Sequence, residues 1–309
     1  MICPICNSPN TKKNGTKLLV TGNRTQEFHC QGCGKYLSFI GATSLANSKY
    51  CSSQIDVGEQ HRLNSVEPGD ILVVEGGNGI RVHGLTDVHV GAVEHDFKKL
   101  QDAIDIIEKD DNARWFGNGD LLELIPPHYK INQRGQDIPP EEQYLEFARL
   151  VAPIKDKCLF IRGGNHDYIR SFNILDFDVC KVLAKELSVP YYRMPGYTKI
   201  KVGKSCYNLV SGHGKSGGAN GDMELNKMAA VYSEGDVFFL GHNHQLYVKP
   251  MDSLIIGKDG TEEIKRRWYI RGGSFLRYAD YARYSFFPII RTGWVTIEFK
   301  EEGIRCWEN

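Results

Sequence analysis

Hydrophobic residues from about position 79 onward alternate between short apolar runs and longer stretches with helical spacing. Runs such as Ile80–Leu85 and Val237–Leu240 have the length and composition of buried strands. Apolar residues that recur every three or four positions between Phe97 and Ile107 predict a helix over about 94–109. This alternation of strand and helix patterns predicts an α/β domain.

Local signals place further elements in the same region. Pro140, followed by Glu141 and Glu142, is typical of the first turn of a helix. Two apolar runs flank Gly203-Lys204 and predict a β-hairpin. The other predicted elements are a helix at 178–187, strands at 114–116 and 158–161, and late antiparallel strands at 268–271 and 294–299.

Polar clusters follow directly after several of these apolar strands. In an open α/β sheet, ligand sites form just beyond the carboxyl ends of the strands. On its own, a residue such as Asn165 or His213 would more often be an ordinary polar or turn residue. Five ordered clusters favour one shared site instead. In chain order they are Asp87-x-His89, Gly119-Asp120-x-x-Glu123, Gly164-Asn165-His166-Asp167, Gly212-His213-Gly214 and Gly241-His242-x-His244.

The residue types in these clusters indicate a site for two metal ions. In Asp87-x-His89 and His242-x-His244, the strand period of two projects both side chains to the same side of an extended chain. Carboxylate, amide and imidazole donors suit Mn, Fe, Zn or Ni better than Ca or Mg. A dinuclear site also needs one oxygen donor that both ions share. We therefore expect two divalent ions.

Together the five clusters resemble the motifs of the calcineurin-like metallophosphoesterase superfamily, over about residues 79–300. The resemblance implies an α/β fold, a four-layer α-β-β-α sandwich, with metal-dependent hydrolysis of phosphoric esters. Asp120 would bridge the two ions. The implied ligands of one ion are Asp87, His89, Asp120 and His244, and those of the other are Asp120, Asn165, His213 and His242.

The resemblance also implies roles for residues that do not bind metal. His166 would stabilise charge on the phosphoryl group and protonate the leaving oxygen, and Asp167 would orient His166. Glu123 would play a supporting role. The flanking residues resemble metallophosphoesterases of phages and other mobile elements, which implies that Arg170 and Lys215 contact phosphate. The alternative for these two side chains is solvated surface.

The first 40 residues form a separate cysteine module. Two Cys-x-x-Cys pairs, 23 residues apart, predict a structural zinc site made by Cys3, Cys6, Cys30 and Cys33. Such a small module needs the metal for folding energy. Residues 17–20 and 26–29 predict a hairpin between the pairs. The module resembles the zinc ribbon of bacterial transposases and their regulators, which implies binding to DNA.

Charge and composition complete the picture. The net charge is zero at pH 7, yet residues 1–50 hold six lysines and arginines against the single acid Glu27, which favours a polyanionic partner. We divide the chain into the ribbon at 1–40, a connector at 41–78 with a strand-like run at 70–74, and the enzyme domain at 79–309. The connector's role and the oligomeric state are left open.

The cellular setting follows from the cysteines and from the start of the chain. Five scattered cysteines outside the two pairs suit a reducing compartment. The first residues lack the basic and apolar regions of a secretory signal, and no segment has the length and hydropathy of a membrane span. We expect the cytoplasm of a bacterial cell or of a phage-infected host, and no membrane partner.

Three functions are compatible with these observations. The first is a nuclease or phosphodiesterase that acts on nucleic acid, with the ribbon as its targeting module. The second is a phosphomonoesterase that acts on phosphoproteins or small nucleotides. The third is a non-catalytic DNA-binding regulator, which is disfavoured because no ligand is lost and His166 is present. The basic ribbon favours the first.

Overall fold

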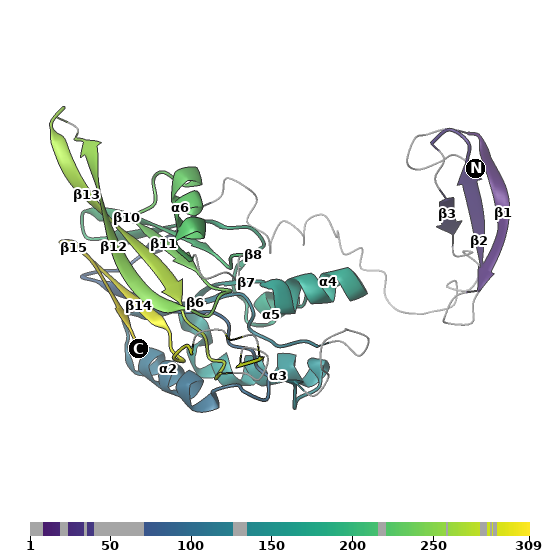
Figure 1. The fold of residues 1–309 in the computed structure, drawn as a ribbon, viewed down its shortest axis with the longest axis horizontal. Helices are drawn as coiled ribbons and strands as arrows, with labels where there is room; N and C mark the ends of the chain where they lie inside the picture. The colour runs from purple at the N-terminus through teal and green to yellow at the C-terminus, as the bar shows by residue number, and fades with distance from the viewer. Residues whose placement is uncertain are drawn as a thin grey trace. The chain divides into compact units, whose positions relative to one another are not determined.

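The structure is a computed structural model that describes residues 9–18, 24–33, 36–39, 71–125, 135–215, 221–257, 259–278, 283–284, 286 and 289–309. The chain divides into two compact units, Met1–Ile55 and Asp56–Asn309, and each is described by itself. Figure 1 shows both units, with the fold coloured along the chain.

The first unit contains a three-stranded antiparallel sheet, β1 (Thr11–Leu18), β2 (Arg24–Cys30) and β3 (Tyr36–Phe39). The pairing of β1 with β2 confirms the predicted hairpin. Cys30 ends β2 as a buried residue, and Cys33 follows in the next turn, half-buried. Cys3 and Cys6 lie outside the described residues, so the zinc site stays a prediction.

The second unit is built on two six-stranded sheets. In the first of them the strands β5 to β8 run parallel, and β14 and β15 extend the sheet antiparallel beside β5. In sheet order its strands are β15 (Gly303–Glu308), β14 (Val295–Lys300), β5 (Ile80–Leu85), β6 (Ala113–Asn118), β7 (Cys158–Arg162) and β8 (Tyr191–Tyr192).

The second sheet mixes parallel and antiparallel pairs. Strands β10, β11 and β13 are parallel neighbours, and β9 pairs antiparallel with β10 through the predicted turn at Gly203, whose φ is +56°. The strand-like run at 70–74 corresponds to β4, which pairs with β9. In sheet order the strands are β12 (Leu246–Ile256), β13 (Glu262–Gly272), β11 (Val237–Leu240), β10 (Ser205–Gly212), β9 (Gly196–Val202) and β4 (Leu72–Glu75).

Helices cover the outer face of each sheet. The helices α2, α3 and α5 bury Leu100, Phe147 and Leu183 in one cluster with Trp115 and Ile161 of the first sheet. The helix α6 covers the second sheet on its other side (Figure 1). The helices are α2 (Phe97–Lys109), α3 (Pro140–Val151), the 3-10 helix η2 (Ala152–Lys157), the π-helical turn η3 (Asn165–Ile169), α4 (Arg170–Leu175), α5 (Val179–Glu186) and α6 (Gly221–Val231).

The apolar core between the two sheets completes the predicted order of layers. Phe116 and Phe160 from the first sheet stack on one another and meet Phe239 from the second, with 5.0 Å between the ring centroids of Phe116 and Phe239. The layers are therefore helices, sheet, sheet and helix, which confirms the predicted α-β-β-α sandwich. Among the described residues, no helix is long and apolar enough to cross a membrane.

The predicted helices at 94–109, 178–187 and from Pro140 are confirmed as α2, α5 and α3. Their ends have the expected caps, since Asp96 accepts a hydrogen bond from the Lys99 amide and Asp178 one from the Lys181 amide. The helix α6 was not predicted, because it begins in a glycine-rich stretch that favours a loop. The predicted strand at 268–271 is the end of β13, but β12 and the rest of the hairpin were not predicted, because the hairpin tip, with Leu254 and Ile256, is exposed and lacks a buried face.

A substitution at Gly84 would test the packing between the two sheets. A Cβ atom there would lie 2.3 Å from Cζ of Phe239 and 3.0 Å from Cζ of Phe116. We expect Gly84→Ala to lower the free energy of unfolding by about 1–3 kcal/mol, measured by urea denaturation of the metal-free protein. Combining it with Phe239→Leu should cost less than the sum of the two single effects. Gly79→Ala, whose Cβ would meet nothing closer than 3.5 Å, is the matched control.

Candidate metal centre

The five polar clusters come together in the second unit. Strands β5, β6 and β7 of the first sheet lead into the clusters of Asp87, Asp120 and Asn165, and strands β10 and β11 of the second sheet lead into those of His213 and His242. Each of these strands is parallel to a neighbour, so their carboxyl ends meet at one edge of the sandwich.

Backbone hydrogen bonds join the loops that carry these residues. The amides of Asp87 and His89 each donate to the next loop, to Gly119 O and Asp120 O, both at 3.0 Å. From the second sheet, the His242 amide donates to Oδ2 of Asp87 at 2.9 Å. The ligand loops of both sheets are therefore held against one another before any metal is considered.

Asp87, His89 and His244 form the first cluster of possible ligands. Nε2 of His244 lies 3.3 Å from Oδ1 of Asp87 and 3.3 Å from Nε2 of His89. On the far side of its ring, Nδ1 of His89 lies 2.7 Å from Oε2 of Glu123, which fixes the ring and turns Nε2 toward His244. Two imidazole nitrogens and a carboxylate that face one point are the donors of a divalent transition metal.

Asp120, His213 and His242 form the second cluster, and the amide of Asn165 lies among them. Oδ1 of Asn165 is 3.1 Å from Nε2 of His213 and 2.7 Å from Nδ1 of His242. Oδ2 of Asp120 is 3.2 Å from Nε2 of His213. Because Nδ1 of His213 lies 2.9 Å from the Asn118 carbonyl, Nε2 is the nitrogen that faces the cluster.

The electrostatics of both clusters favour bound cations. Burial raises the pKa of Asp87, but the imidazoles of His213 and His244 outweigh it and lower that pKa to about 2. Burial lowers the pKa of His213, yet the carboxylate of Asp120 dominates and raises it to about 10. The buried carboxylates thus hold a positive charge on His213, and a metal ion would supply positive charge in the same place.

Asp120 is placed to act on both clusters. Burial raises its pKa, but the imidazoles of His213, His166 and His89 outweigh this and lower the pKa well below its usual value. His89 belongs to the first cluster and His213 to the second, so the carboxylate lies within the field of both. The residues present therefore fit two divalent ions, with Asp120 as the donor that both could share.

The backbone is strained at the possible ligands. Five of them have positive φ angles of 51° to 72°, a conformation that costs roughly 1–2 kcal/mol in a residue other than glycine. Such strain persists only where the surrounding structure enforces it, and it gathers at functional sites. The five residues are Asp87, His89, Asp120, His242 and His244.

Two glycines of the motifs leave space that the carboxylates use. A Cβ atom at Gly164 would lie 2.2 Å from Oδ1 of Asp120, and one at Gly241 would lie 2.6 Å from Oδ2 of Asp87. The backbone has to pass this close to position the Asn165 and His242 loops. Any larger residue at Gly164 or Gly241 would therefore collide with a carboxylate of the site.

His166 stands beside the clusters, held by Glu123 and Arg170. Its Nδ1 lies 3.2 Å from the Glu123 carboxylate, and its Nε2 lies 2.9 Å from the Arg170 guanidinium. Arg170 also donates to the Glu123 backbone carbonyl at 2.6 Å and is buried. Arg170 is thus part of the site, and the alternative that its side chain lies on the solvated surface is wrong.

Asp167 does not take the expected place beside His166. Its carboxylate accepts hydrogen bonds from the amides of Gly164 and Leu121, both at 2.6 Å. It therefore ties the Asn165 loop to the loop that follows β6, and Glu123 and Arg170 orient His166 in its stead. Burial, together with the charge of Asp120, raises the pKa of Asp167 to about 6. Glu123, predicted from the sequence to play a supporting role, lies within hydrogen-bond distance of Nδ1 of both His89 and His166.

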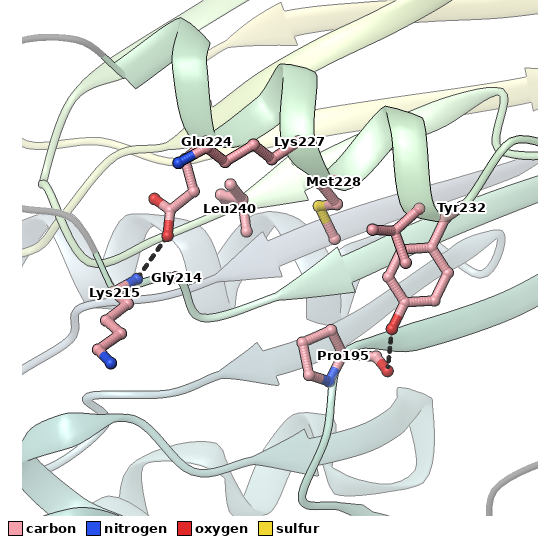
Figure 2. Close-up of a pocket in the computed structure, with 9 residues that line it drawn as sticks. Pro195, Gly214, Lys215, Glu224, Lys227, Met228, Tyr232 and Leu240 are labelled. Carbon is pink, nitrogen blue, oxygen red and sulfur yellow. Dashed lines mark hydrogen bonds between the residues drawn. The ribbon is translucent and has the colours of Figure 1, made fainter.

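Lys215 lines a groove together with Gly214, which directly follows His213, and Figure 2 shows the lining residues. The groove has a volume of about 330 Å³ and a mostly apolar lining. The Lys215 side chain is exposed, and its backbone amide donates to Oε1 of Glu224 at 2.7 Å. Its predicted contact with phosphate stays a prediction. The lining residues are Pro195, Gly214, Lys215, Glu224, Lys227, Met228, Val231, Tyr232 and Leu240.

Comparisons with known proteins find structural neighbours only. No protein-family model matches the chain, and no curated protein matches it. A conserved uncharacterized protein of Streptococcus pneumoniae TIGR4, described as a predicted phosphoesterase, has 14% identity over 75% of this chain and 98% of its own, with a TM-score of 0.35. Vps29 complexed with zinc from Entamoeba histolytica has 14% identity over 74% and 98%, with a TM-score of 0.37. Vacuolar Protein Sorting 29 of Cryptosporidium parvum has 12% identity over 75% and 97%, with a TM-score of 0.40.

Metal content tests the two clusters. After loading with Mn²⁺ and desalting, we expect about two manganese ions per chain, as in other two-metal sites, counted by elemental analysis. His244→Ala should lose the ion of the first cluster and His242→Ala that of the second, leaving about one ion each. Asp120→Asn should weaken both. Equal loss of both ions in His244→Ala and His242→Ala would contradict two separate ligand sets.

Proposed function

We propose that the chain is a metal-dependent phosphoesterase of the calcineurin-like superfamily, of the type that phages and mobile elements encode, and that it hydrolyses phosphodiester bonds in nucleic acid. One observation carries the proposal. Two clusters of side chains that could bind metal are joined where the His242 amide donates to Asp87, and Nε2 of His166 lies 4.0 Å from Oδ2 of Asp120 without belonging to either predicted ligand set. Such an arrangement suits hydrolysis of a phosphoric ester.

Bound divalent ions would supply an activated water and neutralise charge on the phosphoryl oxygens. Asp87, His89 and His244 would hold one ion, Asn165, His213 and His242 the other, and Asp120 both. The third possible metal group, which joins His89 to Glu123 and His166, we assign to the support of the ligands. Glu123 contacts the Nδ1 atom of both imidazoles, which is where a carboxylate orients a ring rather than competes for the metal.

His166 would protonate the leaving oxygen. Because a guanidinium can only donate hydrogen bonds, Nε2 of His166 accepts from Arg170, and Nδ1 keeps its proton toward Glu123. Burial lowers the pKa of His166, but the carboxylates of Asp120 and Glu123 outweigh this and raise it. When Arg170 turns to a phosphoryl oxygen, Nε2 would be free to take up a proton from solvent, and the doubly protonated imidazole would then give that proton to the leaving oxygen.

Nucleic acid as the substrate rests on the first unit. Its basic charge and its pairs of cysteines support a zinc ribbon that holds DNA near the catalytic domain. A phosphomonoesterase that acts on phosphoproteins or small nucleotides is the alternative, since the same metal chemistry serves both. The third reading, a non-catalytic regulator, is disfavoured by the intact environment of His166.

Hydrolysis assays separate these functions. With Mn²⁺, we expect the protein to hydrolyse bis-p-nitrophenyl phosphate and labelled single- or double-stranded DNA. Hydrolysis of p-nitrophenyl phosphate alone would contradict the phosphodiesterase function and favour the phosphomonoesterase. His166→Gln should lower kcat by roughly 10²- to 10⁴-fold while both manganese ions stay bound. Unchanged turnover in this variant would show that His166 is not the acid.

The ribbon can be tested separately from the chemistry. We expect Cys30→Ser/Cys33→Ser to lose one zinc per chain and to bind DNA more weakly, while it hydrolyses bis-p-nitrophenyl phosphate at the wild-type rate. Elemental analysis and fluorescence anisotropy at two salt concentrations measure the two losses. Cys206→Ser, at an exposed position in β10, is the matched control and should keep both properties. An unchanged zinc content in the double variant would refute the ribbon.

A further inference from the structure

Glu224 of α6 connects the two loops that carry the histidines of the second cluster. Its Oε1 accepts a hydrogen bond from the Lys215 amide at 2.7 Å, two residues after His213, as Figure 2 shows. Its Oε2 lies 3.2 Å from the guanidinium of Arg271. Both contacts come from one carboxylate, so a single side chain of the helix reaches both a ligand loop and a strand of the second sheet.

Arg271 carries the connection to the other loop. It lies in β13, and a second nitrogen of its guanidinium donates to the Gly241 carbonyl at 3.1 Å, directly before His242. The Gly241 amide in turn donates to the His213 carbonyl at 3.0 Å. Glu224, Arg271 and the two histidine loops therefore form a closed circuit of hydrogen bonds.

The Glu224–Arg271 ion pair differs from an ordinary surface ion pair in its burial. The side chain of Arg271 is 0% exposed and that of Glu224 is 21% exposed. A buried guanidinium is costly unless charge and directed hydrogen bonds compensate it, and a charge-assisted bond of this kind has a well-defined direction. The pair thus determines where the backbone at Gly241 and Lys215 can lie.

We propose that Glu224 and Arg271 are positioning residues for the second metal ion. They hold the backbone beside His213 and His242 so that both imidazoles, with Asn165, face one point. The inference rests on the proposed two-metal function. Neither residue belongs to the five motifs, and neither is a predicted ligand.

The test is a calorimetric titration of the full-length protein with Mn²⁺, which thiolate sites bind poorly. Wild type should bind two ions. Glu224→Gln removes the charge but keeps the size, and Arg271→Met removes the guanidinium. In both variants the second ion should bind roughly 10- to 100-fold more weakly, as for other residues that orient ligands, while the first ion binds as in wild type. The electron paramagnetic resonance signal should then change from that of a coupled pair to that of a single manganese.

Asp222→Asn is the matched control. Asp222 lies on the same helix and binds β12 through the Tyr247 hydroxyl at 2.7 Å and Nζ of Lys249 at 2.6 Å. Among the described residues, its side-chain hydrogen bonds go to β12 and not to a ligand loop. We expect this variant to bind two ions with wild-type affinity, even if its melting temperature falls.

The outcomes separate the inference from the function on which it rests. If wild type binds no Mn²⁺, the proposed two-metal function is wrong. If wild type binds two ions and Glu224→Gln binds both with the same affinities, or binds both ions more weakly to the same extent, the positioning role is wrong. Should Glu224→Gln fail to fold, Arg271→Lys takes its place. It keeps the charge but not the two-sided contact, so it should show the same selective loss.

Discussion

Two buried carboxylates, Asp87 and Asp120, set the constraint on which the site depends. Almost no surface of either residue reaches water. An ionised carboxylate in such a place is costly unless cations and hydrogen-bond donors surround it. Backbone amides of His242 and His166 donate to the two carboxylates, and the imidazole of His213 supplies positive charge. A divalent metal ion at this place would supply the same kind of compensation.

The two sheets of the sandwich supply the groups that surround these carboxylates. The first sheet positions both carboxylates at the ends of β5 and β6, and the second sheet supplies three histidines after β10 and β11. Phenylalanines pack between the sheets, and Gly84 leaves room for the Phe239 ring. Positive φ angles at five possible ligands show that packing, and not local preference, decides how the loops turn.

A second layer of polar residues gives each imidazole one orientation. Glu123 contacts His89 and His166, the Asn118 carbonyl contacts His213, and Glu224 and Arg271 hold the loops behind His213 and His242. A metal ligand that is free to rotate loses affinity, since ordering it costs conformational entropy on binding. The polar residues around the clusters therefore contribute to metal affinity without binding the metal themselves.

The sequence by itself determined the helices α2, α3 and α5, and its resemblance to a known family implied the sandwich class and the predicted ligands. The helices have local signatures, because helix spacing and caps depend on neighbours along the chain. Only the tertiary structure decided that Glu123 and Arg170, rather than Asp167, orient His166, and that α6 reaches both ligand loops. Two of those contacts join residues more than 40 positions apart, His166 with Glu123 and Glu224 with Arg271. Which of several polar side chains meets a given ring depends on how the sheets pack, and no local pattern records that.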